Sequence, residues 1–251
     1  MKQRLTEWLE VTKKDILNYH EKQFKQTYRS TISFCRWLES LGLLSKDRRD
    51  IIADIGAGMG SNIYYMAKKY PKSFFIGIDI NPNLIRAGNK YFKKSGQSNC
   101  KLEGGDLYAL KRSYIGKFTG IVNYQTLSWL PDYKLPIKKM TELKADWIGI
   151  TSLFYDGDIN CKIVVQDYTA PLLSKPYKEA FYNIYSLRLI QELFKKCGYC
   201  KFDYIPFEID IDLPKPEDEG MRTYTERLAN GKRIQISGPL LMNWYFVLAR
   251  K

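Results

Sequence analysis

A glycine-rich loop between a buried strand and a helix constrains the fold of this chain most. Residues 51–60 read Ile-Ile-Ala-Asp-Ile-Gly-Ala-Gly-Met-Gly, and a helical pattern follows over 62–69. Glycine adopts backbone angles that are closed to other residues, and it lets the main chain approach a ligand closely. A strand, a glycine loop and a helix in this order are typical of an α/β sheet that binds ligands at the carboxyl ends of its strands.

Strand and helix patterns alternate over the middle of the chain. We expect strands near 51–53, 74–78, 100–102, 120–123 and 147–153, and helices over 62–69 and 82–94. This alternation predicts a Rossmann-like α/β fold, with a mainly parallel, twisted sheet and helices on both of its faces. The carboxyl ends of the strands then lie on one side of the sheet.

The two ends of the chain follow other patterns. Helical spacing over 5–24 and 30–41 predicts a helical cap before the first strand. After a helix over 186–196, we expect strands near 202–211, 223–228, 233–236 and 244–248, and Asn230-Gly231 is a strong hairpin signal. We therefore divide the chain into an N-terminal helical cap, 1–45, and a Rossmann-like domain, 46–251. A hairpin insertion near 213–240 would serve as a lid or a substrate wall.

Acidic residues end three successive predicted strands: Asp54, Asp79 and Asp106. The glycine loop alone also fits a dinucleotide site, but Ser61 stands where that fingerprint wants its third glycine. Asp54 would repel a pyrophosphate, whereas it suits a cationic sulfonium ligand and its amino group. Asp79 stands where a carboxylate binds ribose hydroxyls in either kind of site. Each acid alone fits a helix N-cap, but three at successive strand ends favour a ligand site.

This set of residues resembles the class I S-adenosylmethionine-dependent methyltransferases over about residues 50–155. The resemblance implies S-adenosyl-L-methionine as cofactor and S-adenosyl-L-homocysteine as product. It assigns the methionine part of the cofactor to Asp54, Gly56, Gly58 and Gly60, the ribose to Asp79 and Ile80, and the adenine to Asp106 and Leu107. The stretch 122–129 matches the family's fourth-strand motif, which lies between cofactor and acceptor; we assign Asn123 and Gln125 to the cofactor and Trp129 to the substrate.

The same fourth-strand motif bears on the methyl acceptor. It is neither an Asn/Asp-Pro-Pro-aromatic sequence nor a Pro-Cys sequence, so the resemblance to methyltransferases of nucleic-acid bases is poor. A small-molecule or glycan-precursor acceptor is therefore favoured over nucleic acid. The stretches 182–187 and 237–244 are similar to methyltransferases of bacterial capsule and surface-polysaccharide gene clusters, which implies a role in polysaccharide biosynthesis.

The N-terminal cap is rich in polar aromatic and charged residues. We assign Tyr19, Gln23 and Tyr28 to the substrate, and His20 and Arg29 to catalysis. The expected reaction transfers a methyl group to an oxygen of a small, anionic acceptor: a sugar, a phosphate or a phosphoramidate. A hydroxyl acceptor would need a general base, for which His20 is the only histidine, whereas an already anionic oxygen would need only Arg29 to bind it.

The formal net charge of +13 keeps other functions open. Such an excess suits an anionic partner, so an RNA or protein methyltransferase is an alternative. The lysines are scattered, however, with no block of five or six like charges. A non-catalytic partner subunit with a cofactor fold is another alternative, against which the three intact acids argue. The sequence leaves the oligomeric state open.

Two further features concern location and metal binding. No run of 18 or more apolar residues and no signal peptide are found, so we expect no membrane span and a cytoplasmic protein. Five cysteines, an odd number, predict free thiols. Cys197 and Cys200 have CxxC spacing but no nearby partner residues, so we predict no metal site.

Overall fold

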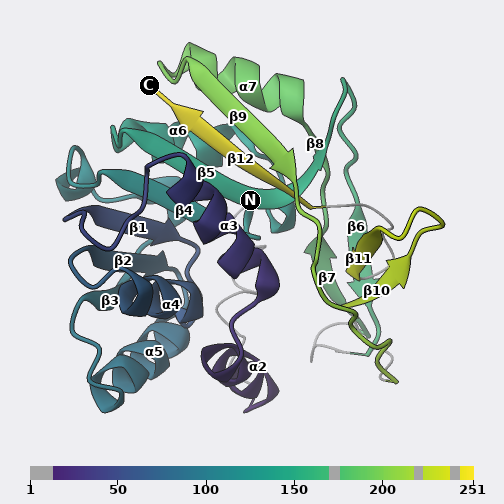
Figure 1. The fold of residues 1–251 in the computed structure, drawn as a ribbon, viewed down its shortest axis with the longest axis horizontal. Helices are drawn as coiled ribbons and strands as arrows, with labels where there is room; N and C mark the ends of the chain where they lie inside the picture. Colours follow the sequence, from purple (N-terminus) through teal and green to yellow (C-terminus); the bar gives the residue numbers. More distant parts are fainter. Residues whose placement is uncertain (1–13, 170–175, 218–222, 238–243) are drawn as a thin grey trace.

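The centre of the molecule is a twisted, mainly parallel sheet (Figure 1). The computed structural model describes residues 14–169, 176–217, 223–237 and 244–251. The strand order is β3-β2-β1-β4-β5-β12-β9, and β8 pairs with β5. The strands are β1 Ile51–Ile55, β2 Phe74–Asp79, β3 Cys100–Gly104, β4 Gly120–Tyr124, β5 Trp147–Tyr155, β8 Tyr185–Ser186, β9 Lys201–Pro206 and β12 Trp244–Arg250. β1 to β5 pair in parallel and β12 runs antiparallel to β5 and β9, which confirms the predicted Rossmann-like fold.

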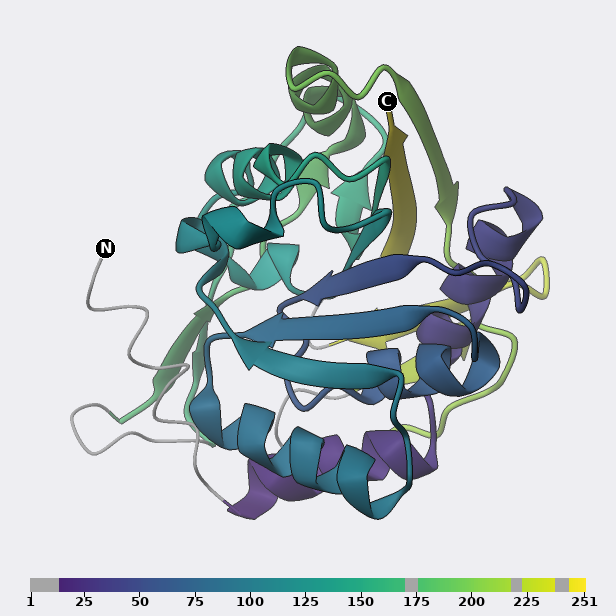
Figure 2. The same ribbon diagram turned by 90° about the vertical axis from the view of Figure 1, so that its left-hand side faces the viewer.

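Helices cover both faces of the sheet and enclose two cores. The first core lies against helices α3 Arg29–Ser40, α4 Ser61–Lys69 and α5 Pro82–Lys94. The second lies against α6 Lys134–Glu142 and α7 Leu187–Lys196. Burial explains α3, whose Phe34 and Leu38, one turn apart, are fully buried. Figure 2 shows α2, Lys14–Lys25, beside α5 on the first face.

Local signals explain why several elements begin where the sequence predicts. The side chain of Asn81 accepts a hydrogen bond from the Asn83 N–H at 2.9 Å, and Pro82 occupies the first position of α5. Both features favour a helix start. Ser186 caps α7 in the same way, because its hydroxyl accepts from the Leu189 N–H at 3.2 Å. These two helices therefore begin within one residue of their predicted starts.

Other elements differ from the prediction. β9 ends at Pro206 rather than at 211. Phe207 and Ile209 beyond it are buried, and the Phe207 N–H still donates to the Trp244 carbonyl at 2.6 Å. α6 was not predicted, because Pro136 and three lysines obscure its apolar stripe. The two-stranded sheet of β6 Val164–Asp167 and β7 Lys178–Phe181 was also missed, since it lies outside the main sheet.

The predicted hairpin insertion is confirmed between β9 and β12. It consists of β10 Thr223–Arg227 and β11 Arg233–Ser237, with Arg227 opposite Arg233. Gly231 in its turn has φ +79°, which glycine adopts without strain. The division into a cap and a domain stays a prediction, and the first part of the predicted helix 5–24 lies outside the described residues.

The expectations about membrane spans, cysteines and metal binding can be compared with the structure. No helix in the described part of the chain is long and apolar enough to cross a membrane. All five cysteines are free thiols, and Cys197 and Cys200 flank the turn between α7 and β9. The described residues contain no group of three or more His, Cys, Asp or Glu side chains that could hold a metal ion.

Candidate cofactor site and its cap

A cavity of about 450 Å³ lies at the carboxyl ends of β1, β2 and β4. The loops that follow these strands form its floor, and residues of α2 and α3 form part of its wall. The volume is within the range of small-molecule and cofactor sites. Eleven of the predicted site residues line it: His20, Gln23, Tyr28, Gly56, Gly58, Asp79, Ile80, Asp106, Leu107, Gln125 and Trp129.

The glycine loop folds back over the end of β2. Gly56, Gly58 and Gly60 have φ of +81°, +56° and +84°, a region that other residues enter only with strain. The N–H groups of Gly56 and Ala57 both donate to the Ile78 carbonyl, at 2.8 and 3.2 Å. Gly60 does not line the cavity: a Cβ there would meet Phe92 and Leu102, so helix packing rather than a ligand requires this glycine.

Asp54, assigned from the sequence to the cofactor, is fully buried near the end of β1 and is not among the residues that line the cavity. Neither carboxylate oxygen has a hydrogen bond of normal geometry within the described residues, although the Tyr124 N–H lies close enough to oppose part of the effect of burial. Burial, followed by the neighbouring charge of Asp79, raises the pKa of Asp54 well above its usual value. Because an unpaired buried carboxylate is costly, this residue fits a site for a cationic ligand.

Asp79 reaches the cavity and also braces the loop. Its Oδ2 accepts from the Gly58 N–H at 2.7 Å, and its Oδ1 accepts from the Asn81 N–H at 2.8 Å. Burial raises the pKa of Asp79, and the backbone N–H groups of Asn81, Gly58 and Ile80 oppose that rise. A carboxylate has about four acceptor positions, so Asp79 retains capacity to accept from a hydroxyl group of a ligand.

Asp106 and its neighbours line the side of the cavity next to β3. One oxygen of Asp106 accepts from the Tyr108 N–H at 2.8 Å and so caps the short helix Leu107–Ala109. Tyr108, which the sequence did not single out, also lines the cavity. Its hydroxyl is buried without a hydrogen-bond partner among the described residues, and burial raises the pKa of Tyr108 to about 12.

Two predicted cofactor residues, Asn123 in β4 and Gln125 just after it, differ in position. Asn123, predicted to bind the cofactor, does not line the cavity; its Nδ2 donates to the Ile55 carbonyl at 2.5 Å and ties β4 to β1. Gln125 does line the cavity and has φ +50°, a strained value for a residue with a side chain. Its Nε2 donates to Ser30 in α3 at 3.3 Å, so it joins the cap to the sheet.

Two cap residues on α2 contact the loop region. The carbonyl oxygen of the Gln23 amide accepts from the Ser61 hydroxyl at 2.8 Å, and its Nε2 donates to the Tyr28 hydroxyl at 3.2 Å. The imidazole of His20 lies over Gly58, where an added Cβ would be 3.0 Å from its Cε1. Burial lowers the pKa of His20 to about 4, so the ring is neutral at neutral pH. The side chain of Tyr19 lies outside the described part of the chain.

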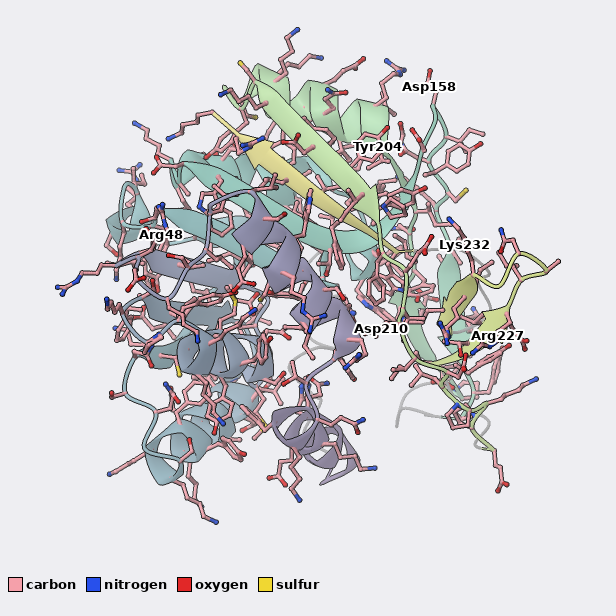
Figure 3. The ribbon with its side chains drawn as sticks, viewed as in Figure 1. Arg48, Asp158, Tyr204, Asp210, Arg227 and Lys232 are labelled. Atoms are coloured by element: carbon pink, nitrogen blue, oxygen red, sulfur yellow. The ribbon has the colours of Figure 1, made fainter. Side chains whose placement is uncertain are left out.

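Arg29, assigned from the sequence to catalysis and acceptor binding, lies outside the cavity in this structure. Its side chain is 37% exposed. Its guanidinium makes two hydrogen bonds to the carboxylate of Asp210, one of them from Nε at 2.7 Å. Figure 3 shows Asp210 between the start of α3 and the hairpin. The Asp210 carboxylate balances the charge of this guanidinium, so Arg29 attracts an anionic acceptor less than a free guanidinium would.

Sequence reasoning also missed contacts of the cap that bring residues far apart in sequence together. Thr31 in α3 donates from its hydroxyl to Asn62 in α4 at 2.8 Å, and both residues line the cavity. Phe24 stacks on Tyr91 of α5, with ring centroids 4.0 Å apart. In the sequence, the polar pair Ser61-Asn62 next to the glycine loop is the one local signal for the polar contact with Thr31.

Comparison with known proteins agrees with this geometry. A family model described as a methyltransferase domain matches residues 46–206. The chain belongs to this methyltransferase family. The match confirms the predicted class of enzyme, a class I S-adenosylmethionine-dependent methyltransferase domain, and its cofactor. The arrangement of Asp54, Asp79 and the two loop glycines fits that cofactor.

Solved structures support the fold. The YcgJ protein from Bacillus subtilis is 13% identical, with 87% of this chain and 97% of that chain covered and a TM-score of 0.56. Magnesium protoporphyrin IX methyltransferase (ChlM) from Synechocystis PCC 6803, with bound SAH, is 15% identical, with 89% and 83% covered and a TM-score of 0.52. At these identities the likeness shows the fold alone.

One relative is closer in sequence but over a shorter stretch. The Uncharacterized protein RP028 of Rickettsia prowazekii (strain Madrid E) is 37% identical over 79 residues. The match covers 32% of this chain and 31% of that relative, so this chain spans less than a third of its length.

Proposed function

We propose that this methyltransferase domain is an active enzyme that methylates a hydroxyl oxygen of a small, uncharged acceptor. The observation that carries the proposal is the position of His20. Its imidazole lines the same cavity as Asp79 and Asp106, and burial lowers its pKa to about 4. The ring is therefore neutral at neutral pH, and it can accept the proton that a hydroxyl loses.

The acidic groups support the cofactor end of this proposal. When bound, S-adenosyl-L-methionine supplies a methyl group on a positively charged sulfur. Asp54 would provide the countercharge, since both of its oxygens are buried without normal hydrogen bonds. Asp79 would accept hydrogen bonds from ribose hydroxyls, and Gly56 and Gly58 leave room for the ligand beside the main chain.

The lining of the cavity favours an uncharged acceptor over an anion. No lysine or arginine is among the described residues that line it. The side chains available to the acceptor are neutral: His20, Gln23, Tyr28 and Trp129. Since Arg29 is engaged by Asp210, a phosphate or a phosphoramidate would find no protein countercharge in this part of the chain. Of the three predicted acceptors, a sugar hydroxyl therefore fits best.

The proton balance of the step assigns a role to His20. A bound S-adenosyl-L-methionine would supply the methyl group, and the imidazole of His20 would take the proton that the acceptor hydroxyl loses as its oxygen is methylated. Loss of the sulfonium charge on transfer would make a protonated imidazole easier to form. The low pKa of His20 would therefore keep the imidazole unprotonated before the reaction, and the imidazole could still accept a proton during transfer.

The wider role is part of the same proposal. A small, neutral sugar acceptor would suit polysaccharide or capsule biosynthesis in the cytoplasm. A part of the segment that carries the glycan resemblance, 238–243, lies outside the described residues. The net charge of +13 favours RNA as a second candidate acceptor, and protein side chains are a third.

The decisive experiment offers several acceptor classes to the protein in parallel, with methyl-labelled cofactor. The panel contains neutral sugars, nucleotide-linked sugars, sugar phosphates, phosphoramidates, bulk RNA and bulk protein. We expect label in a neutral sugar, and loss of transfer in Asp79→Ala. Label found in sugar phosphates, phosphoramidates or nucleotide-linked sugars would favour an anionic acceptor instead. Label found only in RNA or protein would overturn the small-acceptor proposal. Cofactor binding without transfer to any acceptor would support the non-catalytic alternative.

A further inference from the structure

A fully buried amide, Asn183, joins three separate segments of the chain. Its Oδ1 accepts from the Ile163 N–H at 2.9 Å. Its Nδ2 donates to the Leu130 carbonyl at 2.8 Å and to the Tyr185 hydroxyl at 3.0 Å. Its own backbone N–H donates to the Ser128 carbonyl at 2.8 Å. Every N–H of Asn183 therefore has a partner, as does its side-chain oxygen.

Two of these partners are the neighbours of one cavity residue. Ser128 and Leu130, whose carbonyl groups Asn183 holds, stand on either side of Trp129. Trp129 lines the cavity and packs against Tyr182, with ring centroids 5.0 Å apart. Because both flanking carbonyls are held in the interior, the backbone under the indole cannot rotate without leaving buried polar groups unpaired.

Further bonds attach the same loop to the sheet. The Ser128 hydroxyl pairs with the Ser152 hydroxyl and accepts from the Leu153 N–H of β5 at 3.1 Å. The Tyr185 hydroxyl donates to the Leu130 carbonyl at 3.0 Å. A network in which every member is satisfied is rigid, and it specifies one arrangement of the loop.

We propose that Asn183 is a positioning residue of the acceptor site. Its side-chain amide holds the Leu130 carbonyl and its backbone N–H holds the Ser128 carbonyl, and together they fix the indole of Trp129 as a flat wall against which the acceptor rests. The Asn183 variants below remove the side-chain bond and keep the backbone bond. A fixed aromatic ring supplies a large apolar contact face, and it loses little conformational freedom when a ligand binds. The role in acceptor binding rests on the proposed function, but the link between Asn183 and Trp129 can be measured without an acceptor.

Fluorine NMR of protein labelled with 5-fluorotryptophan measures this link. The chain has five tryptophans, and Trp129→Phe identifies the signal of residue 129 by its loss. We expect Asn183→Ala and Asn183→Asp to shift or broaden that signal and to leave the other four unchanged. Tyr185→Phe removes one of the bonds to Leu130 but keeps the amide, so it should cause a smaller change.

Asn99→Ala is the matched control, since the side-chain amide of Asn99 also donates to backbone carbonyl groups. Its Nδ2 donates to Ala67 at 3.1 Å and to Ser73 at 2.9 Å, away from the cavity. This variant should lower the melting temperature and leave the Trp129 signal unchanged. With the acceptor that the panel experiment identifies as a substrate, Asn183→Asp should lower kcat/KM by roughly 10- to 100-fold, mainly through KM. Small misplacements of a substrate have effects of this order. S-adenosylhomocysteine affinity should stay unchanged.

The outcomes separate this inference from the proposed function. An unchanged Trp129 signal in folded Asn183→Asp and Tyr185→Phe would overturn the inference. Equal changes in all five signals would overturn it as well, because they would assign Asn183 to the stability of the whole fold. If the wild-type protein methylates no small acceptor, the proposed function fails, whereas the fluorine signals still decide whether Asn183 positions Trp129.

Discussion

The carboxylate of Asp79 and the backbone N–H of Gly58 are joined by a hydrogen bond of 2.7 Å. This bond connects the end of β2 to the loop that follows β1. The same carboxylate accepts from the Asn81 N–H and lines the cavity. One acid therefore holds the glycine loop in shape, supports the start of α5 and faces the ligand. A substitution of Asp79 should accordingly change both ligand affinity and the loop.

Asp79→Ala should weaken S-adenosylhomocysteine binding by about 3 kcal/mol or more, since each hydrogen bond to a charged group contributes about 1.5–3 kcal/mol. Isothermal calorimetry measures the change. The melting temperature should fall by a few degrees, because the Gly58 and Asn81 N–H groups lose their acceptor. Asp47→Ala, which removes an exposed carboxylate paired with Lys72, is the control and should bind normally. Unchanged affinity in Asp79→Ala would remove Asp79 from the cofactor site.

Gly58→Val should abolish cofactor binding. Residue 58 has φ +56°, and an added Cβ would come within 3.0 Å of His20, so any side chain meets both backbone strain and the cap. The milder Gly58→Ala should weaken binding in the same direction. Gly96→Ala is the control, because Gly96 has φ +69° with no atom within 4 Å of its Cβ position. It should lose a comparable amount of stability and bind the cofactor normally; normal binding by folded Gly58→Val would contradict the assigned loop.

Features encoded by neighbouring residues could be predicted from the sequence. The strand, acid and glycine loop of 51–60 combine into one local signal, and α5 begins at Pro82, where the sequence predicts its start. Asp54 and Asp79 lie at the carboxyl ends of β1 and β2, and Asp106 follows the end of β3 by two residues, so their proximity follows from the topology. These residues therefore lie together at one edge of the sheet as expected.

Features that depend on distant partners could not be predicted. Arg29 is a plausible anion ligand by type, but its partner Asp210 stands 181 residues later, in a segment predicted to be part of a strand. Asn123 was assigned by its place in the motif, yet its amide bonds to β1. Asn183 carries no local signal, because its partners Ile163 and Leu130 are backbone groups of other segments.

Binding of S-adenosylmethionine should release protons and should become tighter as the pH rises. Burial and the charge of Asp79 raise the pKa of Asp54 above its ordinary value of 3.8, and a bound cation lowers it again. Calorimetry in buffers with different ionisation enthalpies counts the released protons. S-adenosylhomocysteine lacks the sulfonium charge and should release fewer. Identical heats in all buffers would show that Asp54 does not respond to the cofactor.

Asp54→Asn should stabilise the protein without cofactor and weaken S-adenosylmethionine binding. In the folded state the raised pKa makes Asp54 bind a proton more tightly than in the unfolded chain. Its contribution to stability therefore falls as the pH rises from about 4 through the folded pKa, and the neutral amide removes this loss. Thermal melts at several pH values measure the effect. A variant that is less stable than the wild type near neutral pH would mean that the carboxylate has partners in the folded protein.

Arg29→Ala should leave the Michaelis constant for the acceptor unchanged. The guanidinium is bound by Asp210 outside the cavity, and the pair is exposed to solvent, which screens it. Steady-state kinetics with the acceptor that the panel experiment identifies as a substrate tests this. Asp210→Ala is the matched variant, because it frees the guanidinium without removing it. A sharp rise of the Michaelis constant in Arg29→Ala alone would restore Arg29 as an acceptor ligand and favour an anionic substrate.

His20→Ala should lower kcat by roughly 10²–10⁴-fold, the range for a lost general base. In the wild type, kcat should stay level from neutral pH down to about 5 and fall only as the pH approaches about 4, where His20 becomes protonated. The pH dependence of kcat, measured at saturating cofactor and acceptor, separates this effect from the weaker cofactor binding caused by Asp54. Gln23→Ala, which removes a hydrogen bond of the same helix to Ser61 but no base, should retain most of kcat.

The pH dependence of stability tests the protonation of His20 independently of the kinetics. The unfolded chain binds a proton at His20 below about 6.5, whereas the folded protein binds it only below about 4. Between these values the unfolded state carries more protons, so stability is lost as the pH falls through this window. His20→Ala should remove that part of the pH dependence of the melting temperature. If the variant keeps the dependence and also keeps its kcat, then His20 is neither buried and neutral nor the base, and the acceptor must lose its proton to another group or be an anion from the start.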